Sequence, residues 1–336
     1  MSRSLPASPP DRMGALRTRV NEGLRSVVAD REPGVLYDPI RYVLAGEGKR
    51  VRPVLLLLVA DALGTSVDRA LPAALAVEVF HNFTLVHDDI MDGSDERRGR
   101  PTIHTATDRG WGTSTALLAG DMMMALSYEL LDQIDADLGR CTVHEVFHPM
   151  VEQLCRGQAL DEALESRSDA EVEDYLDMID GKTVALFAAT FELGAILGGA
   201  DASARARLRH AGHSLGRGFQ IQDDLIDLTG DRDETGKPIG GDLVNGKKTY
   251  VTLRALQQAD DERRAWLHEL LSKPTLSPEE VDAARTWMRD AGVFDDTREA
   301  FTRYFDAARE DLEALPDTPS TRALHYVLDY TECRSR

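Results

Sequence analysis

The stretch Val77–Asp92 reads VEVFHNFTLVHDDIMD, an apolar run that ends in a cluster of acidic residues. A second stretch, Gly216–Asp227, reads GRGFQIQDDLID and ends in the same way. Each contains the pattern DDxxD, whose first and last carboxylates are four positions apart and share one face of a helix. The two stretches therefore predict long helices with paired carboxylates at their C-terminal ends.

This placement of the carboxylates is electrostatically unfavourable. Asp88 and Asp92, like Asp223 and Asp227, repel each other, and a helix C-terminus already carries partial negative charge. Oxygen ligands without a nearby Cys or His pair favour Mg²⁺ or Mn²⁺, and Mg²⁺ binds through one or two carboxylates plus substrate phosphates. The alternative is a solvated acidic helix end in an acidic protein, and the second copy of the motif argues against it.

Basic residues are concentrated in a few motifs although the net charge of the chain is -19. The segment GEGKRVRP (46–53) carries three of them, and Arg97 and Arg98 follow the first acidic cluster. Five of the six lysines also fall in such motifs: Lys49, Lys182, Lys237, Lys247 and Lys248. Because Arg and Lys bind phosphate, these groups predict a diphosphate site, with an apolar tail between the helices. They could instead merely neutralise neighbouring acids.

Composition favours one all-α domain. Hydrophobic residues make up 42% and aromatic residues 6%, and helical periodicity is nearly continuous from about Leu16. We expect a disordered N-terminus at 1–12 and a single domain over 13–336. The longest apolar run, Val54–Ala60, is far shorter than the roughly 20 residues that span a membrane. Three scattered cysteines fit a cytoplasmic protein, and the acidity disfavours nucleic acid as a partner. A GC-rich genome that prefers arginine codons, or adaptation to high salt, could explain the excess of arginine over lysine.

Several boundaries of the helices can be predicted. We expect helices over Val67–Met91, Gly112–Ile134 and Ser203–Leu228, and a loop over 230–248. A capping box of Ser168 and Glu171 predicts a helix from about Ala170, and Ser277 followed by Pro278 predicts another. Gly198 and Gly199 indicate a helix end, and no convincing strand is predicted.

Taken together, the motifs resemble those of the trans-isoprenyl (polyprenyl) diphosphate synthases, of the farnesyl and geranylgeranyl type. They run in family order from Gly46 to Lys248: GxGKRxRP, DDIMDxxxxRRG, GKT, FQIQDD and GKPxGxDLxxGK. The resemblance implies the isoprenoid synthase fold, a single-domain helical bundle around a deep central cavity, usually as a homodimer. It also implies Mg²⁺, with three ions when substrate is bound and Mn²⁺ as a substitute. Where the family usually has GGK, this chain has Gly46-Glu47-Gly48-Lys49, with the spacing from Lys49 to Arg52 kept.

The resemblance also implies a role for each matching residue. Isopentenyl diphosphate would be bound by Lys49, Arg52, His81 and Arg98, and the allylic diphosphate by Arg97, Lys182, Lys237 and Lys247. The metal ligands would be Asp88, Asp92 and Asp223, supported by Asp89, Asp224, Asp227 and Asp242. Catalytic positions beside the reacting carbons would be Lys182, Thr183 and Gln220. Gln158 and Asp161, in GQALDE, would give outer support.

The residues just before the first acidic motif predict the length of the product. A helical turn is about 5.4 Å, close to one isoprene unit, so Phe80, Phe83 and Thr84 would form the floor beneath a growing chain. This pattern resembles synthases that stop at geranylgeranyl diphosphate; farnesyl diphosphate is the alternative product, and both phenylalanines could simply pack in the core. Other functions considered are a terpene cyclase, a non-catalytic partner subunit of a synthase and a generic acidic Mg²⁺-binding protein.

Overall fold

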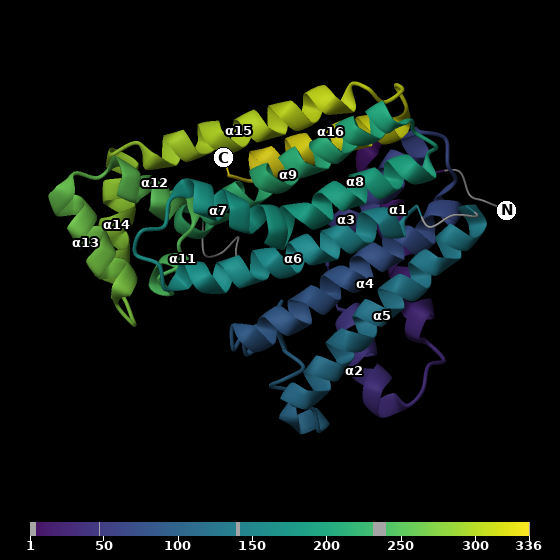
Figure 1. Cartoon of the computed structure of the whole chain (residues 1–336), viewed down its shortest axis with the longest axis horizontal. Coiled ribbons are helices and arrows are strands. Elements are labelled where there is room, and N and C mark those ends of the chain that lie inside the picture. Colours follow the sequence, from purple (N-terminus) through teal and green to yellow (C-terminus); the bar gives the residue numbers. More distant parts are fainter. Residues whose placement is uncertain (1–4, 47, 139–141, 231–239, 336) are drawn as a thin grey trace. The chain divides into compact units, whose positions relative to one another are not determined.

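A computed structural model describes residues 5–46, 48–138, 142–230 and 240–335, and all structural statements below concern these residues. They form an almost entirely helical protein, which confirms the all-α prediction (Figure 1). The helices are α1 (Pro9–Val28), α2 (Gly34–Leu44), α3 (Val51–Ala62), α4 (Val67–Met91), α5 (Thr113–Leu138), α6 (His144–Glu165), α7 (Val172–Ile179), α8 (Ala185–Leu197), α9 (Ala202–Thr229), α11 (Gly241–Val244), α12 (Tyr250–Gln258), α13 (Asp261–Ser272), α14 (Pro278–Asp290), α15 (Val293–Leu312) and α16 (Pro319–Glu332).

Shorter elements complete the fold. Two-residue strands β1 (Glu96–Arg97) and β2 (Arg100–Pro101) pair antiparallel. There are also two 3₁₀ turns, η1 (Thr107–Arg109) and η3 (Cys333–Ser335), and one π-turn, η2 (Asp180–Val184). Within the described part of the chain, no helix is long and apolar enough to cross a membrane.

The chain divides into two compact units, each assembled from separate segments. Unit 1 comprises Met1–Val146, Thr190–Arg205 and Leu315–Leu324, and unit 2 comprises Phe147–Ala189, Ala206–Ala314 and His325–Arg336. Each unit is described by itself below. The single domain expected over 13–336 stays a prediction.

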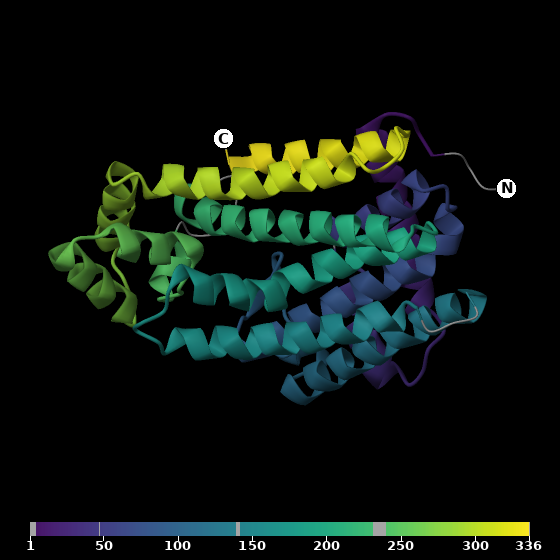
Figure 2. The ribbon, with the colours of Figure 1, turned by 45° about the horizontal axis from the view of Figure 1, so that its top comes forward.

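Unit 1 is organised around α3, which is buried on all sides. Eight consecutive residues, 53–60, are buried, as expected for a helix that is apolar around its whole circumference. Gly194 lets α8 pack closely against α3, because a Cβ at this position would lie only 2.9 Å from Val59 Cβ. The helix α4 packs between this core and α5, and Figures 1 and 2 show α4 and α5 side by side. This packing fixes the end of α4, where the first acidic motif lies.

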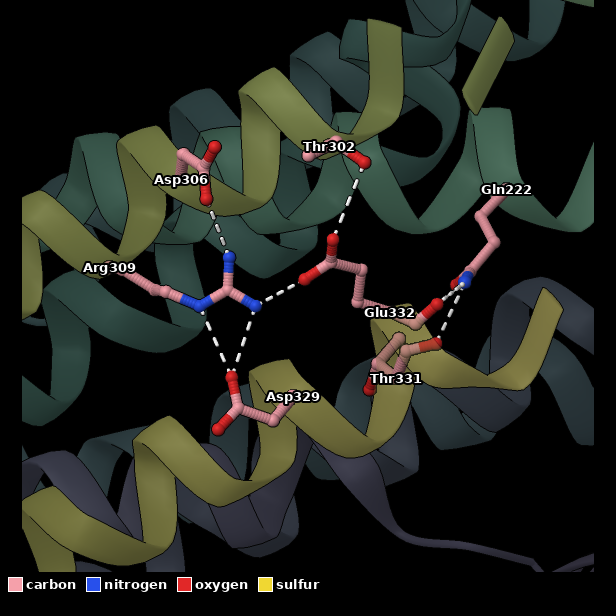
Figure 3. Close-up of polar contacts among 7 residues, drawn as sticks. All are labelled: Gln222, Thr302, Asp306, Arg309, Asp329, Thr331 and Glu332. Carbon is pink, nitrogen blue, oxygen red and sulfur yellow. Dashed lines mark hydrogen bonds and ion pairs between the residues drawn. The ribbon is translucent and has the colours of Figure 1, made fainter. Parts of the chain in front are cut away.

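Unit 2 is organised around α9, which carries the second acidic motif. Gly218 of α9 faces Phe305, Tyr304 and the backbone of Phe301 on α15, so the two helices pack closely. Figure 3 shows how α16 joins them. Gln222 of α9 is buried and its Nε2 donates to the carbonyl oxygens of Thr331 (2.8 Å) and Glu332 (3.0 Å). On the other side, Arg309 of α15 binds three carboxylates, of Asp306, Asp329 and Glu332.

Most predicted helix boundaries agree with the structure. The prediction Val67–Met91 is confirmed to the residue, and α5, α8, α9 and α14 begin or end within four residues of their predicted limits. The predicted cap at Ser168 is wrong. Glu171 is the N-cap of α7, because Asp174, three residues on, accepts a hydrogen bond from the Glu171 N–H at 2.9 Å and completes the capping box there.

Two other predictions need correction. Residues 9–12, expected to be disordered, belong to α1, where the buried Arg12 donates to Ser320 Oγ at 2.7 Å and to Asp61 Oδ2 at 2.6 Å. The loop predicted over 230–248 contains the short α11, and 231–239 lie outside the described residues. The segment that carries Lys182 is the π-turn η2, which lies between α7 and α8.

Candidate active site

The first acidic motif closes α4, and its three aspartates differ in burial. Asp89 is buried, Asp88 is half-buried and Asp92 is exposed at the C-cap. The N–H of Asp92 donates to the carbonyl oxygen of Asp88 at 2.8 Å, so the last turn is closed and regular. The predicted metal ligands Asp88 and Asp92 therefore lie one turn apart at a helix end that water reaches.

A short hairpin brings Arg97 onto this motif. Arg98 and Gly99 join β1 to β2 with φ values of 56° and 70°, as a type I′ turn requires. Arg97 Nε donates to Asp89 Oδ1 at 2.7 Å, and Arg97 Nη2 lies 3.6 Å from Asp88 Oδ2. Burial raises the pKa of Asp89, although Arg97 opposes this effect. Arg97 thus pairs with the neighbouring acids in this structure, as the alternative interpretation of the basic residues expected.

The loop before α3 is built around Arg50. Its φ is 51°, and its side chain is 1% exposed against Glu78 of α4, which is 4% exposed; Nη1 and Oε1 are 2.7 Å apart. The guanidinium also donates to three neutral acceptors: Asn21 Oδ1 (3.0 Å), Leu44 O (3.0 Å) and Gly46 O (2.6 Å). Arg50 is therefore a structural residue of the loop. It fixes the segment that bears the exposed Lys49 and leads into Arg52.

Arg52 and His81, both predicted to bind isopentenyl diphosphate, come together in the structure. Arg52 Nη1 lies 3.4 Å from His81 Nε2. Burial lowers the pKa of His81 well below its usual value, and the positive charges of Arg52, Arg98, Arg97 and Arg50 lower it further. A neutral imidazole among arginines marks a region of positive potential, which suits an anion.

The second acidic motif, on α9, also combines accessible and buried carboxylates. Asp223 is half-buried and accepts a hydrogen bond from Arg334 Nη2 at 3.1 Å. Asp224 is buried, and its Oδ2 accepts from Tyr175 Oη at 2.6 Å and from the N–H of Tyr250 at 3.0 Å. Burial raises the pKa of Asp224 to about 7, against the effect of these hydrogen bonds. Asp224 is thus tied to α7 and α12, whereas Asp223 is accessible.

The end of α9 is joined to α11 through the remaining acids of the motif. The N–H of Asp242 donates to Asp227 Oδ2 at 3.0 Å, and the N–H of Lys247 donates to the carbonyl oxygen of Asp242 at 2.9 Å. Asp227, Asp242 and Lys247 therefore form one connected group. Lys237, also predicted to bind the allylic diphosphate, lies outside the described residues.

The predicted catalytic residues Lys182 and Thr183 lie on the π-turn η2. Lys182 Nζ is 2.5 Å from Asp161 Oδ2 on α6. Thr183 Oγ1 donates to Gln220 Oε1 of α9 at 3.1 Å, and Gln220 Nε2 in turn donates to Asp224 Oδ1 at 3.1 Å. Thr183 and Gln220, predicted to act together, are thus in direct contact and joined to the second acidic motif.

The residues predicted to set product length lie on α4 before the first motif. Phe80 is fully buried, and Phe83 is half-buried with its ring centroid 5.2 Å from that of Phe80 and 4.9 Å from that of His87. Thr84 Oγ1 donates to the carbonyl oxygen of His81 at 2.8 Å. The two phenylalanines thus pack against each other with tilted rings in the two turns that precede Asp88.

The donor chemistry of both motifs fits Mg²⁺. Each motif offers carboxylate oxygens on one helix end, which are the ligands that Mg²⁺ prefers. No cluster of three or more His, Cys, Asp or Glu side chains suited to a metal occurs in the described part of the chain.

Sequence reasoning missed several partners of the site residues. Four pairs were not foreseen: Arg50 with Glu78, Tyr175 with Asp224, Asp180 with Arg217, and Asp223 with Arg334. Their members are 28 or more positions apart, so no local pattern indicates them. Asp161, the partner of Lys182, was named in the sequence analysis as part of the GQALDE segment.

Comparison with known proteins gives one consistent family. The family model described as Polyprenyl synthetase matches residues 33–288. The geranylgeranyl diphosphate synthase of Methanosarcina mazei is 34% identical and the geranylfarnesyl diphosphate synthase of Natronomonas pharaonis 37% identical. The alignments cover 93% and 95% of this chain and 94% and 96% of those proteins. The crystal structure of geranylgeranyl pyrophosphate synthetase from Pyrococcus horikoshii Ot3 is similar with a TM-score of 0.88 and 34% identity, covering 96% of this chain and 97% of that one.

Proposed function

We propose substrates, a product and residue roles for this chain from the premise that it belongs to the polyprenyl synthetase family and is a short-chain prenyltransferase. The substrates are isopentenyl diphosphate and an allylic diphosphate, which the enzyme joins head-to-tail. The observation that carries this proposal is the pair of acidic helix ends, each with an accessible carboxylate and a guanidinium partner: Asp88 with Arg97, and Asp223 with Arg334.

The metal sites follow from these acids. Asp88 and Asp92 on α4 and Asp223 on α9 would hold Mg²⁺, with Asp89, Asp224, Asp227 and Asp242 as supports. Mg²⁺ at these residues, proposed as three ions in the full complex, would supply positive charge that stabilises the departing diphosphate. Arg97 then changes partner, from Asp88 and Asp89 to the diphosphate oxygens. Lys182, Lys237 and Lys247 would complete the allylic diphosphate site.

The isopentenyl diphosphate site lies around His81. Arg52, Arg98 and the exposed Lys49 supply positive charge, and the low pKa of His81 keeps the imidazole neutral, so that it donates or accepts a hydrogen bond without titrating at neutral pH. Arg50 stays paired with Glu78 and holds the loop in place.

The reaction requires no protein nucleophile. The C1–O bond of the allylic diphosphate breaks, and its electron pair leaves with the diphosphate. The double bond of isopentenyl diphosphate attacks C1 of the allylic substrate and forms the new carbon–carbon bond. A proton then passes from C2 of the isopentenyl unit to the departing diphosphate, which restores a double bond. Thr183 and Gln220 would direct oxygen dipoles toward the allylic cation, and Lys182 would bind the leaving group.

Geranylgeranyl diphosphate is the product that we propose. Phe80 and Phe83 pack against each other in the two turns before Asp88, where a floor would stop the chain at twenty carbons. Similar proteins are named farnesyl, geranylgeranyl and geranylfarnesyl diphosphate synthase, and the products in these names differ by one isoprene unit each. In this proposal, the depth of the floor determines which of these product lengths the enzyme makes. A homodimer in the cytoplasm belongs to the same proposal, as the family resemblance implies.

The test is turnover of labelled isopentenyl diphosphate with a fifteen-carbon allylic primer and Mg²⁺. We expect a twenty-carbon product. A double variant, Asp88→Asn with Asp223→Asn, should lose activity by at least about 10³-fold if these acids hold the metal that activates the leaving group. Full activity in that variant would refute the assignment of the metal ligands.

A further inference from the structure

The segment that carries Lys182 and Thr183 has an unusual backbone. Between α7 and α8 the chain makes a π-turn, Asp180–Val184, in place of continuous α-helix. Such turns are rare and less stable than α-helix, and they occur often at functional sites. The surrounding structure must therefore hold this turn in its observed shape.

One support for the turn is a close approach of two backbones. A Cβ on Gly157 of α6 would lie 2.1 Å from the Lys182 nitrogen, and a Cβ on Gly181 would lie 2.6 Å from Gly157 Cα. The turn thus rests directly on α6, where Asp161 binds Lys182 Nζ. This contact fixes the turn on one side.

The guanidinium of Arg217, on α9, holds the π-turn on its other side. Arg217 Nε donates to Asp180 Oδ1 at 2.7 Å, and Arg217 Nη2 donates to Asp180 Oδ2 at 2.5 Å, which makes the pair bidentate. Tyr304 of α15 backs this guanidinium, because Arg217 Nη1 donates to Tyr304 Oη at 3.1 Å. Burial acts to raise the pKa of Asp180, but hydrogen bonds from His213 and Arg217 outweigh it and lower that pKa, so Asp180 remains ionised.

The pair of Asp180 and Arg217 fixes where the π-turn lies along α9. Three residues after Asp180, Thr183 contacts Gln220, which lies three residues after Arg217. The turn and α9 are thus joined at two matched points, one ionic and one between the predicted catalytic side chains. If the turn rotated about α6, Thr183 would lose its contact with Gln220. The pair of Asp180 and Arg217 opposes this rotation.

We propose that Asp180 and Arg217, backed by Tyr304, are positioning residues that hold the π-turn so that Lys182 and Thr183 face the allylic diphosphate. The proposal rests on the proposed function, since it assumes that Lys182 and Thr183 act in prenyl transfer. Neither positioning residue needs to touch substrate. They act through the turn.

The kinetic test uses Arg217→Gln, Arg217→Lys and Asp180→Asn. A misplaced turn should lower kcat by about 10- to 100-fold. The KM for isopentenyl diphosphate should stay within about twofold, because its proposed site lies around His81 in unit 1. Arg217→Lys keeps the positive charge but cannot form the bidentate hydrogen bond, so it should retain only part of the activity. The double variant Asp180→Asn with Arg217→Gln should lose no more than the worse single variant, because both changes break the same link.

The matched control is Arg254→Gln. Arg254 of α12 pairs with Asp296 of α15 at 3.0 Å, also within unit 2. Among the residues that the structure describes, its side-chain hydrogen bonds go to Asp296 and Gln257. A comparable loss of thermal stability with unchanged kcat is expected for this variant. If Arg254→Gln lowers kcat as much as Arg217→Gln does, the effect is general destabilisation and the proposal fails.

Hydrogen exchange separates the proposal from the function on which it rests. In Arg217→Gln, amides of 180–184 should exchange about 10-fold faster than in the unmodified chain, while amides of α12 keep their rates. Unchanged exchange over 180–184 would refute the positioning role even if turnover fell. Absence of any prenyl product from the unmodified chain would refute the function, and with it the catalytic part of this proposal, whatever the exchange data show.

Discussion

Replacement of Glu78 by Gln tests the account of the loop that precedes α3. Arg50 and Glu78 are 1% and 4% exposed in their side chains, so the loss of the carboxylate charge leaves a guanidinium in a low-dielectric site. Removal of one partner from a buried pair costs about 3–5 kcal/mol. The three neutral acceptors that also bind Arg50 remain, so we expect Glu78→Gln to lower the free energy of unfolding by about 3 kcal/mol, the lower end of that range.

The assay is equilibrium unfolding in urea at pH 7, with the loss of free energy taken from the shift of the midpoint. The control is Asp68→Asn, which removes the partner of Arg19 from an ion pair whose side chains are 45% and 57% exposed, also in unit 1. An exposed pair contributes at most about 1 kcal/mol. Because the loop bears Lys49 and leads into Arg52, Glu78→Gln should also raise the KM for isopentenyl diphosphate. A loss no larger than that of Asp68→Asn would refute the reasoning.

Phe83→Ala should lengthen the product from twenty to twenty-five carbons, and the addition of Phe80→Ala should lengthen it further, since each turn of about 5.4 Å admits one isoprene unit. Mass spectrometry of the dephosphorylated products checks this, with the fully buried Phe147→Ala as a control that loses stability and keeps its product; unchanged product length in both variants would remove the floor. His81 keeps a low pKa in the folded state, so the unfolded chain binds the extra proton and stability should fall as the pH drops below about 6.5, by up to about 1.4 kcal/mol per pH unit. His81→Gln should flatten this slope in urea unfolding measured from pH 7 to 5, and an unaltered slope would show that His81 does not cause it.

Features encoded over a few residues were predictable. The helix Val67–Met91 follows from an apolar run that ends in acids, and the cap at Ser277 follows from Pro278 and from Glu280 three residues later. The DDxxD spacing places Asp88 and Asp92 on one helix end for the same reason, since four positions are about one turn. Local sequence therefore gives the elements and the acids at their ends.

Features that depend on tertiary contacts were not predictable. Arg50 stands beside Lys49 and Arg52 in one basic motif, and only its burial against Glu78 distinguishes this structural cation from the two that we propose to bind isopentenyl diphosphate. The π-turn follows from the contact of Gly157 with the backbone near Lys182, which brings together residues from two helices. A capping box could also be placed wrongly, because several acids lie near the start of α7 and each could serve as cap.

The most direct test of the central claim is a product assay with the purified chain. The protein is incubated with Mg²⁺, isopentenyl diphosphate and, separately, the five-, ten- and fifteen-carbon allylic diphosphates, in low and high KCl. The dephosphorylated products are identified by mass spectrometry. The account predicts a twenty-carbon product from all three primers and none when a chelator removes the metal. No product from any primer at either salt concentration would contradict it and favour a non-catalytic partner subunit.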